Sequence, residues 1–240
     1  MRAFVSLSRT VPAAVDSPDC VVVIDVLRSA TVAAAALAAG AVAVRMFATV
    51  EETLAAARSV PPERRLLAGE RGYRKIPGFD CGNSPSEFTP ERVAGRTVFM
   101  TTTNGPAAVA AEPPGVSIFY ACWAVSSATA RAVRAVKPRD VKFVCSGTRR
   151  LVSLEDVVCA GRIASLLGCE PGDDGARLAE CAFREYGDPA RFASMLPFFE
   201  GGRKLREMGM ERDLAPCAEL DAWDFALARE PGGTAFVAVR

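Results

Sequence analysis

Three short apolar runs, each ending in a polar loop, constrain the fold of this chain more than any other feature. The runs are residues 21–24, 97–100 and 141–145. A short continuous apolar run is typical of a strand that is buried on both faces, as in a parallel sheet. A helical stretch follows each loop, and this alternation favours a mostly parallel sheet with helices on both faces.

The rest of the chain continues the same alternation. We expect further strands at 3–7, 41–47, 66–68, 116–120 and 235–239. We expect helices at 29–39, 49–59, 106–111, 126–136, 153–167, 172–186 and 203–208, with a loosely helical segment at 189–199. Gly-Gly and Pro-Pro sites punctuate the chain without forming a long flexible linker. We therefore predict a single domain over residues 1–240.

Composition excludes several classes of function. The chain contains no histidine, which rules out a Ser-His-Asp triad, a histidine base and histidine metal ligands. Its 29 basic residues nearly balance 28 acidic ones, so bulk charge predicts neither nucleic acid nor a membrane surface as a partner. The alanine-rich uncharged stretch 29–44 has 16 residues, fewer than the ~20 that span a membrane. We expect a cytoplasmic protein.

The eight cysteines have irregular spacings and form no Cys-x-x-Cys pair, so no zinc site is expected. Several lie in apolar runs, where a free thiol packs as a small hydrophobic group. We interpret them as structural, with Cys217 the weakest case. In the absence of histidine, catalysis would depend on carboxylates, Arg, Lys, hydroxyl groups, thiols or a metal held by oxygen atoms.

Asp25 and Arg28 follow the first apolar run directly. Ligands of open parallel sheets bind at the carboxyl ends of the strands, and Asp25 lies at such an end. Its carboxylate could coordinate Mg²⁺, act as a base or nucleophile, or only cap a helix. Arg28 could hold a phosphate or carboxylate with its planar guanidinium group, or pair with Asp25.

The loops after the second and third runs offer hydroxyl and amide groups but no strong base or nucleophile. Backbone N–H groups at a helix start can also face an anion there. We therefore expect these loops to bind a phosphate through Thr102, Thr103, Asn104, Gly105, Ser146 and Gly147.

Two further segments carry candidate ligands. Glu70 and Arg71 lie in a turn between two glycines, where they could form a metal ligand beside an anion clamp, or a solvated turn. The long segment that follows lacks periodicity and is rich in turn residues, which favours a functional loop. Its Asp80, Asn83 and Ser84 could contact metal or phosphate, or make Asx-type turns.

Glu155 and Asp156 open a predicted helix and could act as paired carboxylates. However, Ser153-x-x-Asp156 resembles a helix-capping motif, and acidic residues are favoured at a helix N-terminus in any case. Glu155 is therefore the stronger catalytic candidate of the two. We interpret Arg149 and Arg150, just before them, as a solvated pair.

These segments and several others follow one another in a fixed order. They are residues 23–31, 68–72, 76–85, 101–105, 145–148, 153–161 and 202–205, with Asp213, Cys217 and Asp221. In this combination the chain resembles the 2-phosphosulfolactate phosphatase family, from Ile24 to Asp224. The resemblance implies an α/β/α sandwich and a Mg²⁺-dependent hydrolase. The reaction it implies removes phosphate from (2R)-2-phospho-3-sulfolactate, a step toward coenzyme M.

The resemblance also implies roles for the candidate residues. Asp25, Arg28 and Glu155 would be catalytic, and Mg²⁺ would bind Asp25 with Glu70 or Asp80. Whether a carboxylate positions water or attacks directly stays open at this point.

The implied substrate carries phosphate, sulfonate and carboxylate groups and so needs several cations. Arg28, Arg71, Lys75 and Arg203 are the candidates. Two other functions remain as alternatives, namely a phosphatase for a broad range of small anionic phosphate esters and a non-catalytic anion-binding sensor. A homodimer is also left open.

Overall fold

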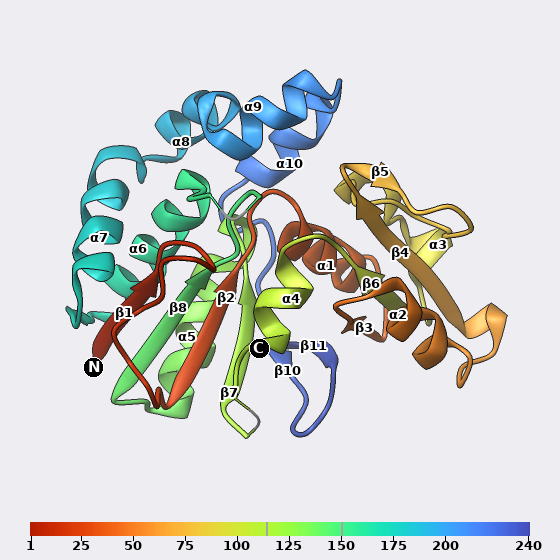
Figure 1. Ribbon diagram of the computed structural model, residues 1–240, viewed down its shortest axis with the longest axis horizontal. Helices are drawn as coiled ribbons and strands as arrows, with labels where there is room; N and C mark the ends of the chain where they lie inside the picture. The colour runs from red at the N-terminus through yellow and green to blue at the C-terminus, as the bar shows by residue number, and fades with distance from the viewer. Residues whose placement is uncertain (114, 150) are drawn as a thin grey trace.

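The computed structural model describes residues 1–113, 115–149 and 151–240 (Figure 1). Within these residues the strands are β1 (Arg2–Ser6), β2 (Cys20–Ile24), β3 (Ala43–Met46), β4 (Arg65–Arg71), β5 (Arg74–Lys75), β6 (Thr97–Thr101), β7 (Ser117–Ala121), β8 (Asp140–Cys145), β9 (Glu170–Pro171), β10 (Ala226–Arg229) and β11 (Ala235–Val239). They form one sheet in the order β5-β4-β6-β3-β11-β10-β7-β2-β8-β1-β9.

The pairing confirms the prediction of a mostly parallel, mixed sheet. The pairs among β4, β6 and β3 are parallel, as are those among β7, β2, β8, β1 and β9. The β10–β11 hairpin lies between these two groups and pairs antiparallel with β7 and with β3. One domain over residues 1–240 stays a prediction, supported by the fact that this sheet contains strands from both ends of the sequence.

Helices cover both faces of the sheet. The helices are α1 (Ser29–Ala38), α2 (Val50–Ala57), α3 (Pro90–Val93), α4 (Gly105–Ala110), α5 (Ser126–Val136), α6 (Leu154–Leu167), α7 (Asp174–Tyr186), α8 (Pro189–Met195), α9 (Glu200–Glu207) and α10 (Leu214–Ala218), with 3₁₀ turns at Pro62–Arg64, Pro85–Glu87, Trp123–Val125, Leu196–Phe198 and Glu211–Asp213. Residues of α5, α6 and α7 pack on one face, and residues of α1 and α4 pack on the other. The three-layer α/β/α arrangement is therefore confirmed.

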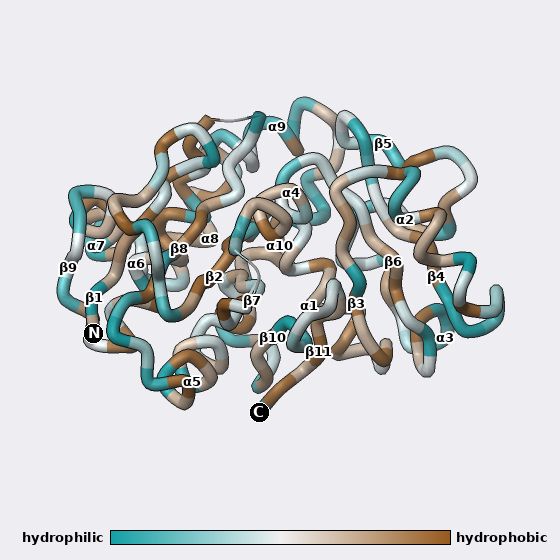
Figure 2. The backbone as a smooth tube through the Cα atoms, turned by 60° about the horizontal axis from the view of Figure 1, so that its bottom comes forward, coloured by the Kyte–Doolittle hydropathy of each residue, from teal (hydrophilic) through white to brown (hydrophobic). Residues whose placement is uncertain are grey.

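Strand β2 shows why the sequence folds in this way. Val22 and Ile24 belong to the core under α6 and α7, whereas Val21 and Val23 belong to the core under α1 and α4. All four side chains are fully buried, and each contributes roughly 1.5–3 kcal/mol of stability relative to an exposed position. Figure 2 shows similar hydrophobic colouring along β6 and β11.

The C-terminal helices determine where a ligand can enter. Figure 1 shows α8, α9 and α10 lying across the end of the sheet at which β2 finishes. The β4–β5 hairpin lies on the other side of the same end. The carboxyl ends of the parallel strands therefore lie between the C-terminal helices and the β4–β5 hairpin. Asp25 and the polar loops follow these strand ends.

The structure contains several elements that local patterns did not predict. Strand β4 is longer than the predicted 66–68, and β5, β9, β10, α3 and α10 were not predicted. Strand β10 is short and flanked by charged residues, whereas α10 contains Pro216. That proline lies in the first turn, where a helix tolerates it. These elements form because of tertiary packing.

Candidate active site

A pocket with a volume of about 80 Å³ lies at the carboxyl ends of β2, β4, β6 and β8. It brings together seven of the predicted site residues, namely Asp25, Arg28, Glu70, Asn83, Thr102, Thr103 and Asn104. These residues come from four separate segments of the chain. The Asp25 loop and the threonine loop therefore meet as predicted, whereas of the predicted loop after β8 only Thr148 lines the pocket and Ser146 and Gly147 do not.

Asp25 lies directly after β2 and is only 5 % exposed. Its Oδ1 accepts a hydrogen bond of 3.0 Å from the backbone N–H of Ser29 at the start of α1. Burial is the largest influence on its pKa, which rises to about 7; the Ser29 N–H opposes this rise and the nearby Glu70 carboxylate adds to it. Asp25 can thus exchange a proton near neutral pH, where a general base works best.

Gly105 allows the turn between β6 and α4 to approach Asp25. A Cβ atom at this position would lie 2.0 Å from the hydroxyl oxygen of Tyr120 and 2.8 Å from Oδ2 of Asp25. Any side chain would therefore displace one of these two residues. Gly105 lies behind the pocket lining, so its effect on a bound phosphate would come through the position of the loop.

Glu70 joins the β4–β5 hairpin to the threonine loop. Its Oε1 accepts hydrogen bonds from the backbone N–H and the hydroxyl group of Thr103, both at 2.8 Å. Its Oε2 accepts a further bond of 2.8 Å from the N–H of Tyr73. Because Glu70 is also buried, these contacts fix Thr103 and Tyr73 at the pocket.

Arg28 pairs with Asp213, which settles the question of its partner. One guanidinium nitrogen, Nη1, donates to Oδ2 of Asp213 at 2.6 Å, and Oδ1 of Asp213 accepts from the hydroxyl of Ser84 at 2.5 Å. Arg28 is 5 % exposed and Asp213 only 1 %. A guanidinium group has several N–H donors, so Arg28 can still bind an anion in the pocket.

Glu155 and Asp156 are neighbours with different surroundings. Asp156 accepts hydrogen bonds from the backbone N–H groups of Val26 (2.8 Å) and Gly147 (3.1 Å). It therefore connects the loops that follow β2 and β8. Glu155 is buried, and its Oε2 has no hydrogen-bond partner in the described part of the chain. Burial raises the pKa of Glu155 to about 7, and the Asp25 carboxylate adds to this rise.

The predicted capping motif at the start of α6 is not formed. Ser153 caps no helical N–H group; instead its hydroxyl lies 2.8 Å from that of Thr148. Glu155 does not line the pocket but lies next to Gly201 in α9. A Cβ atom on Gly201 would approach Oε1 of Glu155 to 2.2 Å, so this glycine lets α9 close over the carboxylate.

Three buried polar atoms near the pocket have no hydrogen-bond partner among the described residues. They are Oδ1 of Asn83, Oγ of Ser146 and Oε2 of Glu155. An unpaired buried polar atom is unfavourable, so such atoms are candidates for contact with water or a ligand. Asn83 lines the pocket directly, whereas Ser146 lies below it and its N–H donates to the carbonyl of Ile24 at 2.9 Å.

Two predicted residues lie away from the pocket. Asp80 is exposed at the edge of the sheet, and its Oδ2 accepts a hydrogen bond of 2.7 Å from the N–H of Leu67. Arg203 lies on the outer side of α9 and pairs with Glu200 (2.5 Å) and Glu207 (2.7 Å). The geometry thus does not bring Asp80 to a metal site or Arg203 to a substrate, because local partners hold both side chains elsewhere.

Arg71 is also directed to local acceptors. Its guanidinium group donates to the hydroxyl of Thr101 at 2.9 Å and to the carbonyl oxygen of Glu70 at 2.8 Å. It therefore supports the two loops that line the pocket instead of lining it. Lys75 is exposed on β5.

The site predicted from the sequence did not include Tyr73 and Arg149, which line the pocket, or the contact of Asp213 with Arg28. Thr148, which also lines the pocket, belongs to the predicted loop after β8. Tyr73 follows the predicted Glu70 turn, and Arg149 follows the third polar loop, so the position of each was a usable signal. Arg149 is exposed, as predicted, but it also lies at the pocket. Arg150 lies outside the described residues.

The donor atoms at the pocket suit Mg²⁺. In the described part of the chain, no group of three or more Asp, Glu, Cys or His side chains could hold a metal ion. The pocket does offer the Asp25 and Glu70 carboxylates and the unpartnered Oδ1 of Asn83. Mg²⁺ typically binds through only a few carboxylates, completed by water and substrate phosphate oxygens. This donor set fits that pattern.

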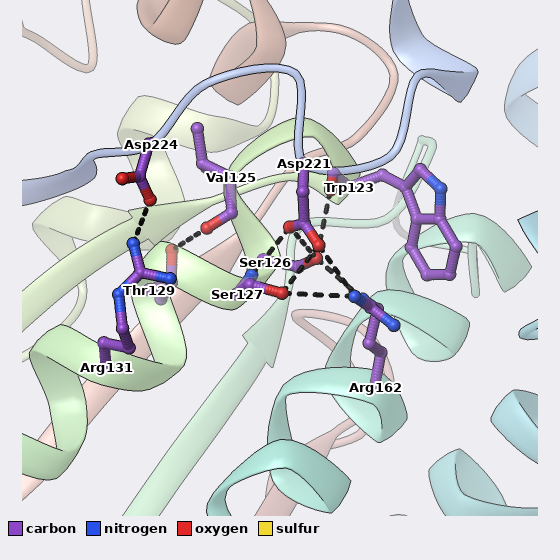
Figure 3. Close-up of polar contacts among 9 residues, drawn as sticks. All are labelled: Trp123, Val125, Ser126, Ser127, Thr129, Arg131, Arg162, Asp221 and Asp224. Atoms are coloured by element: carbon purple, nitrogen blue, oxygen red, sulfur yellow. Dashed lines mark hydrogen bonds and ion pairs between the residues drawn. The ribbon is translucent and has the colours of Figure 1, made fainter.

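A second aspartate–arginine cluster lies beside Trp123 (Figure 3). Asp221 accepts hydrogen bonds from the hydroxyl groups of Ser126 (2.9 Å) and Ser127 (2.6 Å) and from Arg162 (2.7 Å). Burial tends to raise the pKa of Asp221, but these hydrogen bonds together outweigh burial and hold the pKa below its usual value. The cluster fastens the C-terminal segment to α5 and α6.

None of the helices in the described residues is both long enough and apolar enough to cross a membrane. A sequence profile of the family described as 2-phosphosulpholactate phosphatase matches residues 6–230. A protein from Synechococcus sp. (strain JA-3-3Ab), named probable 2-phosphosulfolactate phosphatase, is 41 % identical over 209 residues, which are 85 % of this chain and 86 % of that protein.

A protein of the same name from Thermosynechococcus vestitus is 37 % identical over 212 residues, with the same shares of the two chains. A third, from Gloeobacter violaceus, is 38 % identical over 205 residues, again with 85 % of this chain and 86 % of that protein. The profile covers all of the pocket segments, and each of these relatives matches 85 % of the chain. The chain therefore belongs to the 2-phosphosulfolactate phosphatase family.

Proposed function

We propose that this protein is a Mg²⁺-dependent phosphatase that hydrolyses (2R)-2-phospho-3-sulfolactate to 3-sulfolactate and phosphate. Family membership and the names of its relatives support the reaction. One observation supports the proposal most strongly: Asp25, Arg28 and the Thr102–Asn104 loop line the same pocket. This combination provides a carboxylate, a cation and neutral hydrogen-bond donors for a phosphate ester.

Phosphate binding would involve Arg28 and the threonine loop. Asp213 holds the Arg28 guanidinium group in place, so little side-chain freedom is lost when an anion binds. Thr102 and Thr103 are positioned through Ser29 and Glu70, respectively. Preorganised donors of this kind stabilise the negative charge on the phosphoryl oxygens during transfer.

The chemical step requires an attacking water and a departing alcohol. In this proposal the Asp25 carboxylate orients a water molecule and accepts its proton as the water oxygen bonds to phosphorus. The P–O bond to the ester oxygen then breaks, and the departing oxygen takes a proton from solvent to give the sulfolactate hydroxyl group. Glu155 is buried beneath α9, and the Asp25 carboxylate adds to the rise that burial causes in the pKa of Glu155.

Mg²⁺ would be held by Asp25, Glu70 and Asn83. When bound there it would neutralise charge on the phosphoryl oxygens and polarise the leaving group. The mutual repulsion of Asp25 and Glu70 supports this assignment, since a cation between two carboxylates relieves it.

The test is release of inorganic phosphate from 2-phosphosulfolactate and from a panel of small phosphate esters, with Mg²⁺ and with a chelator. We expect release with Mg²⁺, loss of release with chelator, and the highest kcat/KM for 2-phosphosulfolactate. Absence of release under every condition rejects the enzyme. Release that a chelator leaves unchanged rejects the metal, and equal kcat/KM values across the panel reject the named substrate in favour of a broad-range phosphatase.

The compartment and pathway belong to the same proposal. All eight cysteines are unpaired thiols, six of them buried, which suits a reducing cytoplasm. The product would serve a route toward coenzyme M. A homodimer stays a prediction, which light scattering at several protein concentrations would check.

A further inference from the structure

Arg149 lines the pocket and directly follows Thr148, whose backbone pairs with that of Leu151. The N–H of Thr148 donates to the carbonyl of Leu151 at 3.1 Å, and the N–H of Leu151 donates back to Thr148 at 2.9 Å. The contact between the Thr148 and Ser153 hydroxyl groups anchors Thr148 to the start of α6. These contacts therefore fix where the Arg149 side chain begins.

The backbone of Arg149 has a φ of +51°. This left-handed conformation is unfavourable for a residue with a Cβ atom. Tyr73, on the opposite hairpin, also lines the pocket and has a φ of +69°. Two of the positive-φ residues other than glycine thus lie at the pocket, where such strain is often associated with function.

No acidic side chain among the described residues forms an ion pair with Arg149. Among the described residues, the charged ones that line the pocket are Asp25, Glu70, Arg28 and Arg149. Arg28 already pairs with Asp213, whereas Arg149 has no ion pair or side-chain hydrogen bond within the described residues. Burial raises the pKa of Tyr73 and the Arg149 charge opposes this rise, which agrees with the two side chains being neighbours.

The substrate in the proposed function has more anionic groups than the inner pocket can accommodate. A volume of about 80 Å³ next to Arg28 and the threonine loop suits the phosphate group. The carboxylate and sulfonate would then extend toward the rim. A cation there without a protein partner can bind them without first breaking another ion pair.

We propose that Arg149 binds a second anionic group of the substrate, carboxylate or sulfonate, and makes the enzyme prefer phosphate esters that carry one. This inference rests on the proposed function and deepens it. Arg149 acts on specificity and not on the chemical step, so its loss affects KM for an anionic substrate more than kcat.

The experiment compares wild type with Arg149→Ala, Arg149→Lys and Arg203→Ala. Arg203→Ala is the matched control, because it removes an exposed arginine that pairs on the outside of α9. We expect Arg149→Ala to raise KM for 2-phosphosulfolactate about 10- to 100-fold, the range for loss of a charged hydrogen bond. We expect kcat and the inhibition constant of inorganic phosphate to change less than about threefold. Arg149→Lys should restore part of the lost affinity.

A KM within about threefold of wild type in Arg149→Ala, or an equal change in Arg203→Ala, overturns the inference while leaving the proposed function intact. An equal rise in the inhibition constant of inorganic phosphate also overturns it, because Arg149 would then bind the phosphate itself. If wild type releases no phosphate, the proposed function fails separately. Calorimetry of 2-phosphosulfolactate binding then decides, and equal or undetectable binding by wild type and Arg149→Ala overturns the inference.

Discussion

Two aspartate–arginine pairs fasten the C-terminal segment to the rest of the fold, and they differ in whether the arginine can also bind a ligand. The Arg28–Asp213 pair is almost fully buried, and its arginine lines the pocket. The Arg162–Asp221 pair is more exposed, with side-chain exposures of 15 % and 29 % (Figure 3). Hydroxyl groups of Ser126 and Ser127 complete the second cluster. The same chemical pair thus provides an anion site in one place and a structural anchor in the other.

The carboxylates of the two regions have pKa values that are shifted in opposite directions. Burial raises the pKa of Asp25 and of Glu155 to about 7 at the pocket. At the anchor, hydrogen bonds overcome burial and lower the pKa of Asp221. Ionisation of Asp25 and Glu155 at the pocket is therefore unfavourable, whereas hydrogen bonds stabilise the ionised carboxylate of Asp221. Substitutions in the two regions should therefore differ in their effects on turnover, on stability and on the pH dependence of stability.

The largest expected difference concerns turnover. Asp25→Asn keeps an acceptor for the Ser29 N–H but removes the charge, so we expect kcat/KM to fall about a thousandfold. Asp221→Asn should change kcat/KM less than about threefold, since Asp221 does not line the pocket. Phosphate release at saturating Mg²⁺ measures both, with circular dichroism as the check on folding. A near-normal rate in Asp25→Asn would remove Asp25 from the mechanism.

The next difference concerns stability. Asp213→Asn leaves Arg28 buried without its counter-charge and should lower the free energy of unfolding by about 3 kcal/mol. Asp221→Asn affects a more exposed pair and should cost about 1 kcal/mol. Urea denaturation at pH 7 measures both values. Equal losses would show that the degree of burial does not distinguish the two pairs.

The pH dependence of stability should have opposite signs in the two regions. The pKa of Glu155 is raised in the folded protein. The contribution of Glu155 to the free energy of unfolding is therefore fully present below its unfolded pKa of about 4.3, and it is lost as pH rises through about 7. This loss amounts to about 3 kcal/mol and should be absent in Glu155→Gln. The pKa of Asp221 is lowered, so its contribution is present above its unfolded pKa and is lost as pH falls through the folded value.

Urea denaturation of metal-free protein between pH 4 and pH 8 tests both signs. Glu155→Gln should gain stability relative to wild type as pH rises toward 8, whereas Asp221→Asn should approach wild type as pH falls. A Glu155→Gln curve parallel to that of wild type would mean that Glu155 is not the titrating group.

The smallest expected effect belongs to a pair that is outside both regions. Arg203 makes exposed ion pairs on α9, which are worth little in water. Arg203→Ala should therefore change the free energy of unfolding by less than about 0.5 kcal/mol and leave kcat/KM unchanged. Thermal denaturation and the phosphatase assay provide the measurements. A large loss of activity would return Arg203 to the substrate site.

Much of the fold was predictable because it is encoded locally. The apolar runs became β2, β6 and β8, and the helix at Ser126–Val136 lies where it was predicted. Asp25 and the Thr102–Asn104 loop were expected to meet because the carboxyl ends of parallel strands share one edge.

Other parts of the site could not be read from local patterns. The Arg28–Asp213 contact joins residues that are 185 positions apart, and local sequence patterns do not indicate contacts at such a separation. Asp80 and Arg203 have suitable chemistry, but nearby partners direct them elsewhere. The sequence shows which residue types are present near a site; tertiary packing decides which of them face it.

The β10–β11 hairpin has a consequence for how the protein is made. These strands come last in the sequence, yet they separate β3 from β7 in the middle of the sheet. While the ribosome synthesises the chain, the loops with Asp25 and with Glu70 emerge well before the strands that join their halves of the sheet. Until residues 226–239 emerge, β3 and β7 present open edges that can pair with other chains. We therefore expect the nascent chain to be prone to aggregation until synthesis reaches this hairpin.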